Sequence, residues 1–81
     1  MYTTYVMKSK TFDIRYVGST SDLKKRILHH NNGFSKYTKG RGPWILVYKE
    51  DFPTRSEAMM WELYFKTGVG REFLDSKIKK H

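Results

Sequence analysis

The chain has 81 residues, and its 16 lysines and arginines against 8 aspartates and glutamates give a formal net charge of +8. It has no cysteine, which excludes disulfide bonds and thiolate zinc sites, and no stretch approaches the ~20 consecutive apolar residues of a membrane span. The N-terminal stretch MYTTYVMKSK lacks the pattern of a signal peptide, so we expect a single cytoplasmic domain over residues 1–81.

The first half of the chain predicts a hairpin followed by a helix. Residues 2–8, YTTYVMK, and residues 14–18, IRYVG, have the aromatic and β-branched content of strands, with a polar turn between them. Residues 19–22 contain several candidate N-caps for a helix over about 22–30. Leu23 and Ile27 lie one helical turn apart and mark its buried side.

The second half predicts a basic loop over residues 34–44, a strand over 45–50 and two helices. The apolar start of the strand, ILVY, favours the middle of a small sheet. A capping box at residues 54–57, TRSE, predicts a helix over about 55–66. A last helix is expected over about 70–79, with three apolar residues facing inward: Val69, Phe73 and Ile78.

The resulting element order, β-β-α-β-α-α, does not alternate as a parallel βαβ fold does. We therefore expect an α+β fold with a three-stranded antiparallel sheet flanked by helices. The positive charge favours nucleic acid as the partner. A membrane partner is not expected, because the basic residues are spread through the chain and not gathered on one amphipathic helix. We assume a monomer.

Glu62 is the most informative polar residue, because it interrupts the apolar stretch AMMWELYF at residues 58–65. A helix that is apolar on every side is mostly buried, and a carboxylate inside it needs a counter-charge, a hydrogen-bond donor or a metal. The alternative is an ion pair with Lys66, four residues later, on an exposed edge.

Arg26 and His30 are also four residues apart and share one helix face. Arginine binds phosphate through two parallel hydrogen bonds, and histidine exchanges a proton near neutral pH. A solvated basic helix end is the alternative. Tyr5 and Tyr16 lie on the two hairpin strands, where both could simply be core aromatics. Neither a Gly-rich phosphate loop nor a histidine-rich metal motif is present.

Taken together, these residues resemble the GIY-YIG nuclease family, and especially its small stand-alone bacterial members. Thr4-Tyr5-Val6 is similar to the first motif of that family and Tyr16-Val17-Gly18 to the second. The helix pair Arg26-x-x-x-His30 and the later Glu62 are similar to its remaining site residues. The resemblance covers about residues 3–75. It implies a metal-dependent endonuclease that hydrolyses DNA, structure- or strand-selectively, in DNA repair or recombination.

The resemblance also implies roles for these residues. Glu62 would hold Mg²⁺ or Mn²⁺. One carboxylate is enough to bind the ion, because Mg²⁺ keeps several waters as its other ligands. Arg26 would clamp a phosphate oxygen. Tyr5 together with His30 would act as the base, and Tyr16 would be a second positioning group.

Residues of the basic loop are candidates for binding the substrate. Lys36, Lys39 and Arg41 can neutralise phosphates, and Tyr37 or Trp44 could stack on an unpaired base. Trp44 is alternatively a core residue that precedes the third strand.

Two other functions remain open. Some catalytic GIY-YIG proteins carry a further polar residue after the metal-binding glutamate, and no residue here stands at a matching position. The first alternative is therefore a non-catalytic nucleic-acid-binding module of the same fold. The second is a small basic protein bound to RNA or ribosomes, which would need only the positive charge.

Overall fold

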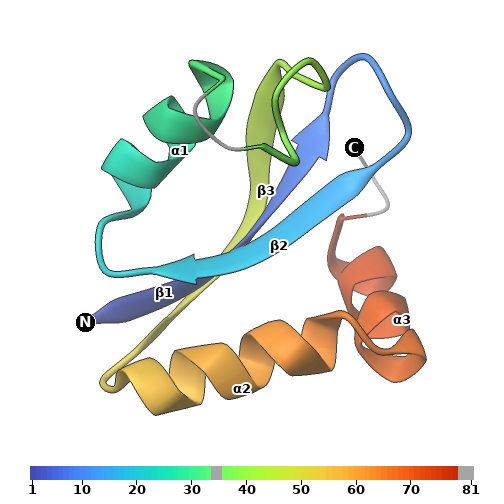
Figure 1. The fold of residues 1–81 in the computed structure, drawn as a ribbon. Helices are drawn as coiled ribbons and strands as arrows, with labels where there is room; N and C mark the ends of the chain where they lie inside the picture. Colours follow the sequence, from blue (N-terminus) through green and yellow to red (C-terminus); the bar gives the residue numbers. More distant parts are fainter. Residues whose placement is uncertain (34–35, 79–81) are drawn as a thin grey trace.

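The computed structural model describes residues 1–33 and 36–78, and it confirms the expected α+β fold and element order (Figure 1). The elements are β1 (Tyr2–Ser9), β2 (Arg15–Thr20), α1 (Leu23–Asn31), β3 (Trp44–Phe52), α2 (Arg55–Phe65) and α3 (Gly68–Ile78). Their bounds differ from the expected ones by one or two residues. Residues 34–35 of the expected basic loop and residue 79 of the expected last helix lie outside the described residues.

The sheet is antiparallel, with the strand order β2-β1-β3. The expectation that the third strand is central was wrong, because β1 occupies that place. Thr4, Tyr5, Val6 and Met7 are all fully buried, as a strand covered on both faces requires. The apolar start of β3 lies instead at a sheet edge, and Ile45 is 42% exposed.

Helices cover the two faces of the sheet unequally, with α1 on one side and α2 and α3 on the other (Figure 1). Successive residues of β1 point to opposite faces. Tyr5 and Met7 therefore pack with Trp44 and the apolar side of α1, whereas Val6 packs with Phe65 and the apolar side of α3. The sheet thus separates two small cores, and both predicted site tyrosines, Tyr5 and Tyr16, belong to the first.

Two expectations about helix packing were wrong. Helix α2 is not mostly buried: Ala58 and Phe65 are, but Met60 and Leu63 are each 66% exposed. Three strands cover only one side of this helix, so its outer apolar residues face solvent. Val69 is also 66% exposed.

The orientation of α3 explains the exposure of Val69. A Cβ atom at Gly70 would lie 1.9 Å from the carbonyl oxygen of Tyr64, so only glycine permits this close approach of α3 to the end of α2. The buried side then continues at four-residue intervals through Leu74 to Ile78, and Phe73 is half-buried beside it.

Other local expectations were confirmed. The Thr54 hydroxyl caps α2 by accepting from the Glu57 amide at 3.2 Å. Asp22, one of the candidate N-caps, caps α1 by accepting from the Lys25 amide at 3.2 Å.

Within the described residues, no helix is long and apolar enough to cross a bilayer.

Candidate active site at the edge of strand β2

Tyr5 reaches the edge of the sheet by crossing over Gly18, its register partner on β2. A Cβ atom at Gly18 would lie 2.7 Å from the Tyr5 hydroxyl oxygen, so a side chain there would occupy the space of the phenol. The glycine therefore allows a side chain from the central strand to contact α1.

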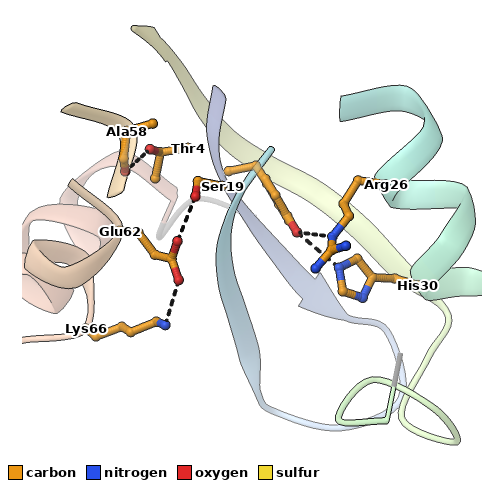
Figure 2. A network of polar contacts seen from close by, with 8 residues as sticks. Thr4, Ser19, Arg26, His30, Ala58, Glu62 and Lys66 are labelled. Atoms are coloured by element: carbon orange, nitrogen blue, oxygen red, sulfur yellow. Dashed lines mark hydrogen bonds and ion pairs between the residues drawn. The ribbon is translucent and has the colours of Figure 1, made fainter. Parts of the chain in front are cut away.

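The Tyr5 hydroxyl meets two side chains of α1. It lies 3.0 Å from His30 Nε2 and accepts a hydrogen bond from Arg26 Nε at 3.3 Å. Figure 2 shows Arg26 and His30 next to each other, both extending from α1. Arg26 and His30 share one helix face, as their spacing predicted. Sequence spacing alone did not place Tyr5 on that face.

His30 is almost completely buried, at 2% exposure. Its Nδ1 atom lies 2.9 Å from the Thr38 hydroxyl, so both ring nitrogens have partners. Burial, and then the nearby positive charge of Arg26 and of His29, lowers the pKa of His30 from 6.5 to about 4. At neutral pH the imidazole is uncharged, with one nitrogen free to accept a proton.

Tyr5 is fully buried, and that burial raises its pKa above the ordinary value of 10.0. The hydrogen bond from Arg26 acts in the opposite direction and is the smaller effect. The Arg26 cation is therefore beside the phenol, but it does not lower the pKa of Tyr5 overall. Tyr5 remains a neutral phenol at pH 7, and His30 is the acceptor within reach of its proton.

Tyr16 and Arg26 form the accessible part of this cluster, since both are half-buried. The Tyr16 ring lies 4.8 Å from the His30 ring and 6.3 Å from the Tyr5 ring, measured between centroids. Hydrogen bonding to Tyr5 is the main cause that raises the pKa of Arg26, and Tyr16 contributes in the same direction. Any substrate at this edge therefore meets Tyr16 and Arg26 before Tyr5 or His30.

Glu62 lies on the other side of β2, and the β2 ribbon passes between it and Arg26 (Figure 2). Its carboxylate accepts hydrogen bonds from the Ser19 hydroxyl at 2.8 Å and from Lys66 Nζ at 2.9 Å. Ser19 follows Gly18, so the alternation of β2 places one residue beside Tyr5 and the next beside Glu62. The candidate site therefore consists of two groups of residues on opposite faces of one edge strand.

The environment of Glu62 differs from the expected one. Its side chain is 24% exposed and is not enclosed by apolar residues. The ion pair with Lys66, which the sequence left open as the alternative, is present. The carboxylate therefore does not require a metal for charge compensation.

The donor atoms around Glu62 nevertheless fit one Mg²⁺ or Mn²⁺ ion. The described residues contain no cluster of three or more His, Cys, Asp or Glu side chains that could hold a metal. Mg²⁺ needs only one or two carboxylates when waters and substrate phosphate complete its coordination. The partly exposed Glu62 carboxylate, beside the Ser19 hydroxyl, meets that need once the Lys66 ammonium moves away from it.

The described part of the basic loop lies next to Tyr16. The Tyr37 ring is 49% exposed and lies 5.6 Å from the Tyr16 ring. The Arg41 guanidinium lies 5.1 Å from the centre of the Tyr37 ring, and its Nη1 donates to the Tyr37 carbonyl at 2.6 Å. Lys36 and Lys39 are exposed. This loop thus places exposed cations and one exposed aromatic ring beside the site.

Trp44 has the structural role. It is 3% exposed, and its indole nitrogen donates to the Thr38 carbonyl at 3.1 Å. The alternative in which Trp44 stacks on a base was therefore wrong.

Sequence reasoning missed two residues that hold the site together, Ser19 and Thr38. Ser19 appeared only as a possible helix cap, although its place directly after the motif glycine was a usable signal once β2 was known to extend to Thr20. Thr38 has no such signal, because its contact with His30 depends on how the loop folds back.

The fold carries the residues on which the resemblance to the GIY-YIG family rests. The sheet carries two motif tyrosines, one flanking helix supplies an arginine and a histidine, and a helix on the other face supplies a glutamate. The chain belongs to the GIY-YIG family, since the sequence profile of the GIY-YIG catalytic domain matches residues 1–73. This membership supports a nuclease-type function with DNA as the substrate class.

The chain is also similar to small bacterial proteins of the UPF0213 group. A UPF0213 protein of Clostridium perfringens is 49% identical over 63 residues, which span 76% of this chain and 67% of the relative. One of Staphylococcus saprophyticus is 48% identical over 64 residues, or 78% and 77% of the two chains. The solution NMR structure of a UPF0213 protein from Bacillus halodurans is 38% identical, covers 93% of this chain and 82% of that one, and has a TM-score of 0.56.

Proposed function

We propose that this protein is a metal-dependent endonuclease that hydrolyses DNA phosphodiester bonds at the edge of β2, with selectivity for strand or structure. The observation that carries the proposal is the juxtaposition of a hydrogen-bonded Tyr5–His30–Arg26 cluster and the Glu62 carboxylate across a single strand. Neither group alone is unusual in a small basic protein. Their convergence at one accessible edge, in a member of a nuclease family, supports a reacting phosphate between them.

In this proposal the accessible residues contact the substrate. Arg26 donates to a non-bridging phosphate oxygen, where negative charge increases in the transition state. Tyr16 orients the attacking water. Glu62 holds Mg²⁺ or Mn²⁺, which when bound supplies polarisation of the phosphoryl group and stabilisation of the departing oxygen.

The buried residues receive the proton of the attacking water. Because Arg26 Nε can only donate, it directs the Tyr5 proton away from itself and toward His30 Nε2. The other ring nitrogen then carries its hydrogen toward Thr38. As the water oxygen bonds to phosphorus and the ester P–O bond breaks, the water proton passes to Tyr5 while the Tyr5 proton passes to His30. The departing oxygen takes up a proton from solvent. His30 returns its proton to solvent after the product leaves.

Cleavage of single-stranded, duplex and branched DNA with Mg²⁺ or Mn²⁺ tests the proposal. We expect wild type to cut at least one of these substrates and Glu62→Gln to cut none, although both fold. Glu72→Gln, on the exposed surface of α3, is the matched control and should keep full activity. Binding without cleavage on every substrate would contradict the proposal.

One observation favours a second candidate, the non-catalytic nucleic-acid-binding module. The Glu62 carboxylate already has two partners, Ser19 and Lys66, so the protein is electrostatically complete without a metal. In that case Glu62→Gln would lower stability and leave DNA binding unchanged. A place in DNA repair or recombination is proposed as part of the first candidate.

A further inference from the structure

A groove of about 810 Å³ runs along the edge of β2 on the side of α3. Arg15 and Tyr16 of β2 line one wall, and Arg71 and Asp75 of α3 line the other. An ion pair between Arg15 and Asp75, at 2.9 Å, ties the two walls together. The groove therefore lies between a strand and a helix that are joined by an ion pair.

The rim of this groove is positively charged. Its lining includes four basic and two acidic residues: Lys8, Arg15, Lys66 and Arg71, with Asp13 and Asp75. Such an excess of positive charge on a groove wall attracts a chain of phosphates more strongly than it attracts a neutral ligand.

Aromatic and apolar side chains line the interior. Tyr16 and Tyr37, which contact each other, stand at the end nearest the candidate active site, and Val17, Phe65 and Leu74 are among the apolar residues of the groove. A cationic rim around aromatic and apolar surface is the combination that binds single-stranded nucleic acid. In such sites bases stack on the rings while phosphates meet the cations.

The size of the groove favours a single strand over a duplex. Its volume falls within the range of sites that enclose small ligands, about 300–1,000 Å³. That range accommodates a few unstacked nucleotides. A groove of this volume does not enclose a duplex, whose major groove alone is about 12 Å wide.

We infer that this groove binds an unpaired nucleic-acid strand that flanks the cleaved bond. The inference rests on the proposed function, because the groove meets both halves of the candidate site. Tyr16 belongs to the cluster around Tyr5, and Lys66, also in the lining, pairs with Glu62. A strand lying here leaves the reacting phosphate at the β2 edge. The substrate class is then DNA with an unpaired segment next to the cleaved bond.

Binding in the presence of EDTA tests the groove separately from catalysis. The probes are fluorescent oligothymidylate, oligouridylate and a blunt DNA hairpin duplex of equal phosphate number, followed by anisotropy. We expect wild type to bind oligothymidylate more tightly than the hairpin. Arg71→Glu should weaken oligothymidylate binding about tenfold and reduce the salt dependence by about one phosphate contact. Tighter binding of oligouridylate would assign the same groove to RNA.

Lys24→Glu is the matched control, because it reverses one exposed charge on α1, outside the groove. It should change oligothymidylate binding less than twofold. The inference would be overturned if Arg71→Glu and Lys24→Glu lost equal affinity for oligothymidylate. It would also be overturned if Arg71→Glu lost as much affinity for the hairpin as for oligothymidylate. If Arg71→Glu loses its far-ultraviolet circular dichroism, Arg71→Ala replaces it, with an expected loss of about threefold.

The two proposals fail in different ways. Glu62→Gln should bind oligothymidylate in EDTA as wild type does. If binding depends on Arg71 but wild type cleaves no substrate, the groove proposal stands and the nuclease proposal is contradicted. If cleavage is unchanged by Arg71→Glu and does not depend on an unpaired flanking segment, the nuclease proposal stands and the groove proposal is contradicted.

Discussion

The phenol of Tyr5 fills the space that a side chain at position 18 would need. The two residues are register partners on β1 and β2, and a Cβ atom at Gly18 would lie 2.7 Å from the Tyr5 hydroxyl and 3.1 Å from the Tyr16 ring. The second motif of the family thus ends in glycine here for a steric reason. The position of the Tyr5 hydroxyl therefore depends on the backbone of β2 at Gly18.

Gly18→Ala should therefore displace Tyr5. We expect a loss of about 1–3 kcal/mol in the free energy of unfolding, measured by urea denaturation, because the added methyl overfills a packed space. Gly68→Ala is the control: a Cβ there meets no described atom within 4 Å, so stability should stay level or rise. Equal effects of the two variants would contradict the steric account.

Tyr5→Phe should damage both stability and cleavage. It leaves the buried His30 Nε2 without its partner, at a cost of about 1–3 kcal/mol. Tyr48→Phe deletes a hydroxyl at an exposed site, where it donates to Glu50 at 2.7 Å, and should cost much less. Thermal denaturation compares the two variants. Full cleavage by Tyr5→Phe would remove Tyr5 from the mechanism.

Protonation of His30 should destabilise the protein as the pH falls. The pKa is about 4 when folded and near 6.5 when unfolded, so the unfolded chain takes up the proton first. The stability difference is absent above about pH 6.5, develops as the pH falls toward 4, and amounts to about 3 kcal/mol below it.

Titration of the His30 ring by NMR measures this directly. The ring signal should move near pH 4, and His30→Gln should flatten the dependence of unfolding free energy on pH between 6.5 and 4. A midpoint near 6.5 would show that the imidazole is solvated, contrary to its 2% exposure.

Removal of Lys66 should strengthen metal binding. The ammonium and a divalent cation compete for the same carboxylate oxygen of Glu62, and an i,i+4 surface pair of this kind contributes about 0.3–0.5 kcal/mol. We expect Lys66→Ala to bind Mn²⁺ about twofold more tightly than wild type, as measured by electron paramagnetic resonance of free Mn²⁺. Lys77→Ala, on α3, should leave the affinity unchanged. Weaker binding by Lys66→Ala would place the metal away from Glu62.

Local sequence patterns predicted those features that depend on neighbours in the chain. The cap at Thr54 and the shared face of Arg26 and His30 both follow from fixed helical spacing. The centre of the sheet did not follow, because ILVY at the start of β3 has the composition of a buried strand whichever position it occupies. Hydrophobic content cannot distinguish an edge from a centre when the protein leaves Ile45 exposed.

The candidate site was predicted in the same uneven way. Its members were identified by type and by family resemblance, and the structure brings Tyr5, Arg26 and His30 together. The pairing of Glu62 with Ser19 could not be predicted, since it joins residues 43 positions apart. The exposed side of α2 was missed because a three-stranded sheet cannot cover every apolar residue of an 11-residue helix.

Within the sheet, strand β2 pairs with β1 alone, and the two halves of the site lie on its opposite faces. Edge strands open more readily than central ones, through local fluctuations that leave the rest of the fold intact. Fraying of β2 would move Ser19 away from Glu62, and Tyr16 away from Tyr5 and His30, without unfolding any helix. Amide hydrogens of β2 should thus exchange with solvent sooner than those of β1, and the geometry of the site should be lost at denaturant concentrations that leave the helical signal unchanged.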